Sequence, residues 1–167
     1  MGELQGRVAI ITGAGRGIGR EHALLFAAEG AKVVVNDLGG ANDGTGTDAT
    51  PAQEVVNEIK AMGGEAVANY DNVADWEGAQ RMVNMAVETF GDLDILVNNA
   101  GILRDRVLVN MTEAEWDAVI QVHLKGHFAP SRWAAAYWRE QHKAGVTKPR
   151  NIVHTSSTSG LFANPGQ

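Results

Sequence analysis

Short apolar segments alternate with amphipathic stretches along the 167-residue chain. The apolar segments are rich in Val, Ile, Leu and Ala, as buried strands are, and cover residues 7–11, 32–36, 65–70, 93–97 and 151–155. Helical periodicity fills the spaces between them, over about 16–29, 50–62, 75–90 and from 112 onward. Parallel strands need crossover helices of this kind, so the pattern predicts an α/β fold with a doubly wound parallel sheet in the strand order 3-2-1-4-5.

Two of the predicted helices carry a start signal. Thr50 is expected to cap the helix over 50–62, with Pro51 in its first turn and Gln53 completing a capping box. Thr112 and Glu115 form a second capping box, which opens a long helix. These local signals support the boundaries that periodicity suggests.

A segment without periodicity, residues 38–49, separates the second strand from its helix and is rich in Gly, Asn, Asp and Thr. A solvated surface loop is the preferred interpretation. A lid over a bound ligand is the lesser alternative, because long loops beside a ligand are often functional.

Composition indicates one globular domain, with 44% hydrophobic residues, a formal net charge of -6 and no cysteine. No apolar run approaches the roughly 18 residues of a membrane helix, and no secretory signal opens the chain, so we expect no membrane association. The acidic balance argues against nucleic acid as a partner. The lack of cysteine agrees with a reducing, cytoplasmic location, and the histidines show no metal-ligand spacing, so no metal is predicted.

A glycine-rich segment follows the first predicted strand and leads into the first helix. It reads Thr12-Gly13-Ala14-Gly15-Arg16-Gly17-Ile18-Gly19, which is T-G-x-x-x-G-x-G and not the common G-x-G-x-x-G. Glycines at a helix N-terminus let backbone N–H groups approach a diphosphate. Asp37 ends the next apolar segment, at a spacing suited to a carboxylate that binds the ribose of a dinucleotide. The alternatives are a flexible loop for the glycines and a turn residue before Gly39-Gly40 for Asp37.

Further motifs follow the later strands: Asp71-Asn72-Val73, Asn98-Asn99-Ala100-Gly101 and Ser156-Ser157. Together with the glycine pattern, they closely resemble the short-chain dehydrogenase/reductase family over nearly the whole chain. The resemblance implies a Rossmann fold, a single NAD-binding domain over residues 1–167, and hydride transfer between a secondary alcohol and a ketone.

The resemblance also implies which residues bind the cofactor. They are Thr12, Gly13, Arg16, Gly17, Ile18, Gly19, Asp37, Asp71, Asn72, Asn99, Ala100 and Gly101. Asp37 favours NAD over NADP, because a carboxylate accepts hydrogen bonds from both ribose hydroxyls and repels a 2′-phosphate. Arg16 is able to pair with such a phosphate, but the charge of Asp37 stands where that phosphate would lie.

The family's catalytic serine corresponds to Ser157, with Ser156 as the competing choice and a plain polar loop as the alternative. The family's tyrosine and lysine would follow Gln167, so we expect the domain to be C-terminally incomplete, truncated before the catalytic tyrosine. Tyr70 and Tyr137 do not replace it, since neither is followed by lysine at the fourth position. His123 stands where many members have an asparagine of a proton relay. A histidine satisfied on a packed helix is preferred there to a relay residue.

The segments 36–40, 101–106 and 122–126 resemble the dehydrogenase part of peroxisomal-type multifunctional enzymes and their bacterial single-domain relatives. That resemblance implies a lipid-like substrate, a 3-hydroxyacyl-CoA or a hydroxysteroid. The alternative is a non-catalytic short form or fragment that binds nucleotide. We also expect a homo-oligomer, and association or poor solubility if the edge of the fifth strand stays open.

Overall fold

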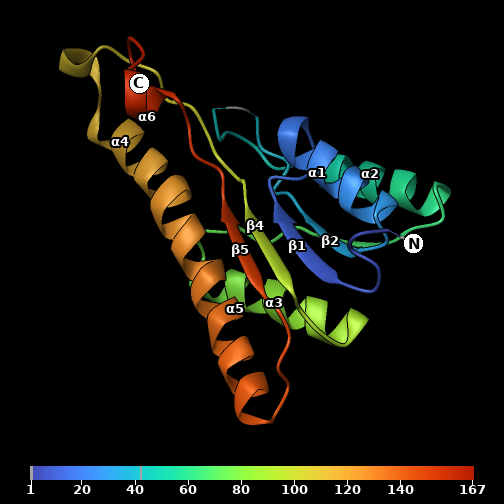
Figure 1. Cartoon of the computed structure of the whole chain (residues 1–167). Coiled ribbons are helices and arrows are strands. Elements are labelled where there is room, and N and C mark those ends of the chain that lie inside the picture. The colour runs from blue at the N-terminus through green and yellow to red at the C-terminus, as the bar shows by residue number, and fades with distance from the viewer. Residues whose placement is uncertain (1, 42) are drawn as a thin grey trace.

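The computed structural model describes residues 2–41 and 43–167, and its centre is a parallel sheet (Figure 1). The strands are β1 (Val8–Thr12), β2 (Lys32–Asn36), β3 (Glu65–Asn69), β4 (Ile95–Asn98) and β5 (Asn151–His154). Their order in the sheet is β3-β2-β1-β4-β5, and each neighbouring pair is parallel. The predicted fold class and strand order are therefore confirmed.

Helices cover both faces of the sheet. The helical elements are α1 (Gly17–Ala28), α2 (Thr50–Ala61), α3 (Trp76–Phe90), α4 (Glu113–Ile120), α5 (Gly126–Lys143), α6 (Ser159–Phe162), the 3-10 turn η1 (Leu108–Asn110) and the π-helical turn η2 (Gln121–Lys125). Figure 1 shows α1 and α2 on one side of the sheet and α3 and α5 on the other. In the described residues, no helix combines the length and the apolar character that crossing a membrane requires.

Alternate residues of each inner strand serve the two halves of the core. On β1, Ala9 and Ile11 pack toward α1 and α2, whereas Val8 and Ile10 pack toward α3 and α5. Both faces of these strands are buried, which explains why they are continuous apolar runs instead of alternating ones.

The strand register brings the predicted site residues to one edge of the sheet. Thr12 pairs with Asn36, and Asn36 pairs with Asn69, so β1, β2 and β3 end side by side. On the other side of β1, Asn98 of β4 pairs with His154 of β5. The segments that follow these strands therefore lie together, where parallel α/β sheets bind ligands.

The predicted helix starts are half right. Thr112 and Glu115 form the expected capping box at α4. The box at α2 is wrong, because Thr50 is already the first helical residue and its N–H donates to the Asp48 carboxylate at 2.9 Å. Gln53 instead bonds to Asn57 one turn later. The side chain of Asp48, two residues upstream, thus accepts from the Thr50 N–H, a bond that the motif assigned to the Gln53 side chain.

The long helix predicted after Thr112 is one continuous rod with a wide turn inside it. Its first part is α4, its middle is the π-helical η2, and its last part is α5 (Figure 1). A π-turn is rare and often occurs at a functional site. This turn contains His123.

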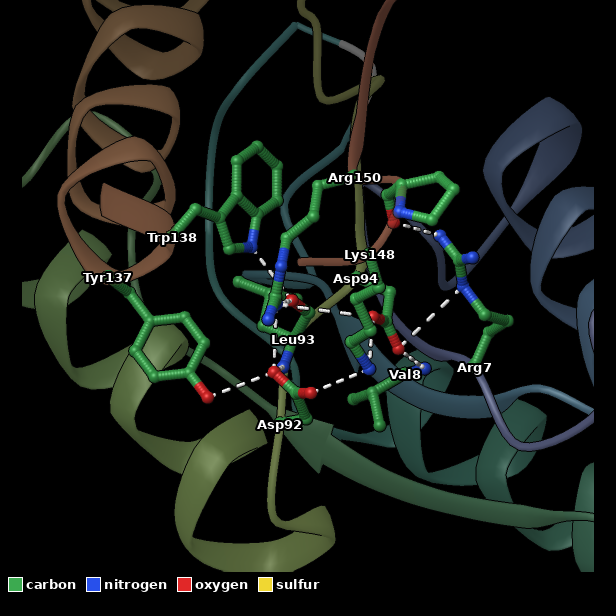
Figure 2. Close-up of polar contacts among 10 residues, drawn as sticks. Arg7, Val8, Asp92, Leu93, Asp94, Tyr137, Trp138, Lys148 and Arg150 are labelled. Carbon is green, nitrogen blue, oxygen red and sulfur yellow. Dashed lines mark hydrogen bonds and ion pairs between the residues drawn. The ribbon is translucent and has the colours of Figure 1, made fainter. Parts of the chain in front are cut away.

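A charged network joins β4, β5 and α5 at the opposite end of the sheet from the predicted site (Figure 2). Lys148 lies 2.6 Å from both Asp92 and Asp94, and Arg150 lies 2.8 Å from Asp92. The Tyr137 hydroxyl donates to Asp92 at 2.9 Å. This network fixes the start of β4, and through it the register of the strand that carries the site.

Two pKa values record the strength of this network. Burial opposes ionisation of Asp92, but hydrogen bonds from Lys148, Arg150, the Leu93 N–H and Tyr137 outweigh it and hold its pKa well below the ordinary range. Burial, followed by the hydrogen bond to Asp92, raises the pKa of Tyr137 to about 12. Tyr137 is therefore a structural hydrogen-bond donor at neutral pH.

Candidate functional site

A cavity of about 480 Å³ opens at the carboxyl edge of the sheet. Ten of the twelve predicted cofactor-binding residues line it: Gly13, Arg16, Gly17, Ile18, Asp37, Asp71, Asn72, Asn99, Ala100 and Gly101. The loop 38–41 and the start of η2 complete its walls. One concave site thus gathers residues that are up to 109 positions apart in the sequence, from Gly13 to Val122.

The other two predicted residues, Thr12 and Gly19, support the cavity from behind. The buried Thr12 hydroxyl accepts hydrogen bonds from the N–H groups of Asn99 and Ala100, at 2.9 and 3.0 Å. The Asn99 side chain returns two bonds, to the carbonyls of Thr12 and Gly13 at 3.1 and 3.2 Å. The glycine-rich turn and the segment after β4 are therefore locked together.

The glycines of the turn have different structural roles. A Cβ atom on Gly19 would lie 2.1 Å from the Gly13 carbonyl oxygen, and one on Gly13 would lie 2.8 Å from the Ala100 Cα. A Cβ on Gly15 would lie 2.8 Å from the Asp37 carboxylate. These three glycines make room for the protein itself, whereas among the described atoms nothing lies within 4 Å of a Cβ on Gly17.

Gly17 is therefore the position where the absence of a side chain leaves space beside the cavity. It is the first residue of α1, has a positive φ of 54°, and lines the cavity. A diphosphate fits this cradle, because the first-turn N–H groups of α1 and the positive end of the helix dipole are there.

Asp37 is held in place by the loops on either side of it. One carboxylate oxygen accepts from the Gly15 N–H at 2.8 Å and the other from the Gly39 N–H at 2.7 Å. The side chain is half-buried at the cavity wall, and each oxygen keeps lone pairs for further donors. These contacts orient the carboxylate without using all of its capacity.

Two buried asparagines that sequence reasoning missed position Asp71. Asn36 donates to the Asn69 side chain at 2.8 Å and to the Asp71 carbonyl at 2.9 Å. Asn69 in turn accepts from the Asp71 N–H and donates to its carboxylate at 2.9 Å. The signal in the sequence was an asparagine ending each of two apolar strands. Buried amides are costly unless they are fully hydrogen-bonded.

Arg81 adds a charged clamp from α3. Its guanidinium donates two hydrogen bonds to one Asp71 oxygen, at 2.9 and 2.6 Å. With Asn69 on the other oxygen, both sides of the Asp71 carboxylate have protein partners. The neighbouring Asn72 also lines the cavity.

The loop 38–49 is more than a solvated connection. Leu38, Gly40, Ala41 and Gly44 line the cavity, and a Cβ on Gly44 would lie 3.1 Å from the Ile102 side chain. Two hydrogen bonds, from the Ala41 N–H to the Thr45 carbonyl and from the Gly44 N–H to the Ala41 carbonyl, shape the loop from within. The preferred interpretation of a surface loop agrees with the exposure of residues 43–49, and the loop also forms one wall of the site.

Ser157 lies after β5 and outside the residues that line the cavity. Its hydroxyl accepts from the Ser159 N–H at 3.1 Å. The two tyrosines lie elsewhere: Tyr137 bonds to Asp92 in the network of Figure 2, and Tyr70 bonds to Gln53 at 3.3 Å. Within the described residues, neither tyrosine accompanies Ser157.

Three histidines lie in a row behind the cavity. The rings of His123 and His127 are 6.4 Å apart, and those of His127 and His154 are stacked at 5.5 Å. Burial is the main cause that lowers the pKa of His127, which favours the neutral form of this ring. In the part of the chain that the structure describes, no group of three or more His, Cys, Asp or Glu residues is arranged to hold a metal ion.

The fold and the site together define a class of protein. The family model described as short chain dehydrogenase matches residues 7–167, so the chain belongs to the short-chain dehydrogenase family. A crystal structure of a short chain dehydrogenase from Mycobacterium avium superposes with a TM-score of 0.92 at 60% identity, over 99% of this chain and 59% of that one.

Two curated relatives narrow the comparison. Peroxisomal multifunctional enzyme type 2 of Drosophila melanogaster is 52% identical over 162 residues, covering 97% of this chain and 26% of the relative. Hydroxyacyl-CoA dehydrogenase ChsB1 of Mycobacterium tuberculosis is 47% identical over 171 residues, covering 99% of this chain and 51% of the relative. The chain therefore spans about half or less of the length of these relatives.

Proposed function

We propose that the cavity binds a nicotinamide adenine dinucleotide and that the chain is the cofactor-binding part of an oxidoreductase. The observation that carries this proposal is the convergence of the Gly17 cradle, the Asp37 carboxylate and the Asn99–Gly101 segment on one cavity. Diphosphate at the N-terminus of α1 and ribose at Asp37 match the two polar groups of the adenosine half. When bound, such a cofactor supplies hydride transfer.

The Asp37 carboxylate supports NAD over NADP. Both of its oxygens are held by backbone N–H groups, so the negative charge has a fixed position at the wall. A 2′-phosphate beside that charge would be repelled, whereas two ribose hydroxyls would donate to it. Arg16 lines the same cavity but directs its guanidinium toward the Gly40 carbonyl at 3.4 Å.

For the substrate, we propose a secondary alcohol on a 3-hydroxyacyl-CoA, with a hydroxysteroid as the second candidate of the same lipid-like class. The support is likeness to relatives named as a hydroxyacyl-CoA dehydrogenase and a peroxisomal multifunctional enzyme. The family's serine role falls to Ser157, which would donate a hydrogen bond to the substrate oxygen. The hydroxyl can donate this bond while its oxygen accepts from the Ser159 N–H, since a hydroxyl both donates and accepts.

A nucleotide-binding role without catalysis is the second candidate function for this chain. Two observations favour it: Ser157 is outside the cavity lining, and both tyrosines are bound at distant places within the described residues. In that case the cavity binds the dinucleotide while no acid/base group within residues 2–41 and 43–167 completes hydride transfer.

The exposed face of the long helix supports association with a second copy of the chain. Trp116, Ile120, Leu124 and Phe128 recur at every fourth position, and their exposed fractions run from 39% to 65%. Exposed apolar stripes of this kind mark protein interfaces. We propose a homo-oligomer that buries this stripe.

Calorimetric titration of the purified chain with NADH, NADPH and ADP tests the cofactor, and absorbance of NADH formed from NAD tests the chemistry. Two substrates, 3-hydroxybutyryl-CoA and a hydroxysteroid, separate the two lipid-like candidates. Binding with turnover supports the dehydrogenase, and binding without turnover supports the nucleotide-binding form. A chain that binds none of the three nucleotides refutes the proposal. For the variant Asp37→Ala in the same titrations, Asp117→Ala on the exposed surface of α4 serves as the matched control.

A further inference from the structure

His123 contacts the backbone of a cavity-lining residue, although it does not line the cavity itself. Its Nε2 atom lies 3.1 Å from the Ile102 nitrogen and 2.8 Å from the Ile102 carbonyl oxygen. One ring nitrogen therefore faces both the donor and the acceptor of a single residue. A neutral ring accepts from the N–H or donates to the carbonyl, according to its tautomer.

The ring also packs on the residue before Ile102. A Cβ atom on Gly101 would lie 2.7 Å from His123 Cε1, so a glycine is required for the ring to reach this position. Gly101 and Ile102 both line the cavity. The His123 ring is thus the outer support of this stretch of the wall.

The local backbone explains how His123 reaches the wall. It lies in the middle of the π-helical turn η2, between α4 and α5. Its neighbours Gln121 and Val122 line the cavity. The wide turn therefore contributes two residues to the wall and one to its support, which gives the turn a role beyond joining two helices.

Ile102 is supported from the other side by the loop 38–49. Its side chain faces Gly44, and a Cβ there would lie 3.1 Å from two Ile102 carbon atoms. The backbone of Ile102 is bound by His123 while its side chain contacts the loop. The position and orientation of Ile102 therefore depend on two segments that are about 80 residues apart in the sequence, one at Gly44 and one at His123.

The strand order shows which half of a dinucleotide this wall meets. Asp37 follows β2 and Asp71 follows β3, whereas Gly101 and Ile102 follow β4, on the opposite side of β1. With the adenosine half at Asp37, as the proposed function has it, the nicotinamide half lies toward β4. The wall of Gly101 and Ile102 is then the wall beside the nicotinamide half.

We infer that His123 is a positioning residue for the nicotinamide half of the cofactor, acting through the Ile102 backbone and resting on the proposed function above. Removing the ring frees the Ile102 N–H and carbonyl and takes away the packing on Gly101. The adenosine half, held at Asp37 and Asp71, keeps its contacts. The expected consequence is a selective loss of affinity for the whole dinucleotide.

The test uses His123→Ala, His123→Gln and the control His142→Ala, since His142 is exposed near the end of α5 and outside the cavity lining. In His123→Ala, exchange of the Ile102 amide hydrogen, followed by NMR in the chain without cofactor, rises about tenfold. Affinity for NADH falls about tenfold while affinity for ADP stays within about twofold. His123→Gln, which carries one donor and one acceptor, restores most of both values.

Four results decide the question. Unchanged Ile102 exchange in His123→Ala overturns the inference, and so does an equal loss of NADH and ADP affinity. A parent chain that binds neither nucleotide refutes the proposed function, and with it the cofactor role of His123. A parent chain that binds both, matched in every value by His123→Ala, refutes the inference alone. His123 is exposed and outside the core, and the Gln variant reports on the same contacts if the Ala variant folds poorly.

Discussion

Thr12→Val isolates the contact that joins the glycine-rich turn to the segment after β4. Valine matches threonine in shape but replaces the hydroxyl with a methyl group. The change removes the acceptor for the N–H groups of Asn99 and Ala100, at 2.9 and 3.0 Å, and also the longer bond of 3.3 Å that the hydroxyl donates to the Val97 carbonyl. Thr12 is fully buried, so the new methyl group replaces the hydroxyl without meeting solvent.

The magnitude follows from counting the groups left without a partner. A buried donor that loses its partner costs about 1–3 kcal/mol, so two donors set a range of about 2–6 kcal/mol. Asn99 and Ala100 are half-buried, which allows water to reach them in part and favours the lower end. We therefore expect a decrease of about 2–3 kcal/mol in the free energy of unfolding.

Urea unfolding followed by circular dichroism measures this decrease, with Thr12→Ser as the matched control. Serine keeps the hydroxyl and loses the methyl group, so it costs about 1 kcal/mol and keeps both N–H bonds. We expect the parent chain to be the most stable, Thr12→Ser to be intermediate and Thr12→Val to be the least stable. A Val variant as stable as the Ser variant would refute the reasoning, because burial of the methyl group would then outweigh both hydrogen bonds.

Three further predictions test other parts of the molecule. Asp92→Asn lowers the free energy of unfolding by about 2 kcal/mol at pH 7. Because the pKa of Asp92 is depressed in the folded state, its contribution to the free energy of unfolding is present above the ordinary pKa near 4 and is lost as the pH falls below that value. The difference in free energy of unfolding between parent and variant therefore shrinks toward pH 2. A difference that does not change with pH contradicts this account. Asp37→Ala weakens the affinity for NADH about tenfold or more, as measured by calorimetry, and reduces the preference for NADH over NADPH. Equal losses of affinity for the two nucleotides would argue against a ribose contact. Leu124→Glu reduces the oligomer mass in light scattering, whereas Leu25→Glu, at a position of α1 that is 57% exposed against 65% for Leu124, leaves it unchanged; loss of mass in both variants would show a general charge effect.

Features decided within a few neighbouring residues were open to prediction from sequence. The core strands are continuous apolar runs because both of their faces are buried, and this character is visible without any tertiary contact. The Thr112–Glu115 capping box also closes within one helical turn. At Thr50 the same motif failed, because the Asp48 carboxylate, two residues upstream, accepts from the Thr50 N–H in place of the Gln53 side chain.

The sequence by itself thus determined the order of elements, the family and ten of the residues gathered at the carboxyl edge of the sheet. Only the tertiary structure decided how those residues are supported. Thr12 meets Asn99 across 87 positions, Asn36 meets Asn69 across 33, and His123 meets Ile102 across 21. The physical reason is that periodicity and capping act over one or two turns of chain, whereas these hydrogen bonds exist only after the strand register and the π-turn bring their partners within 3 Å or so.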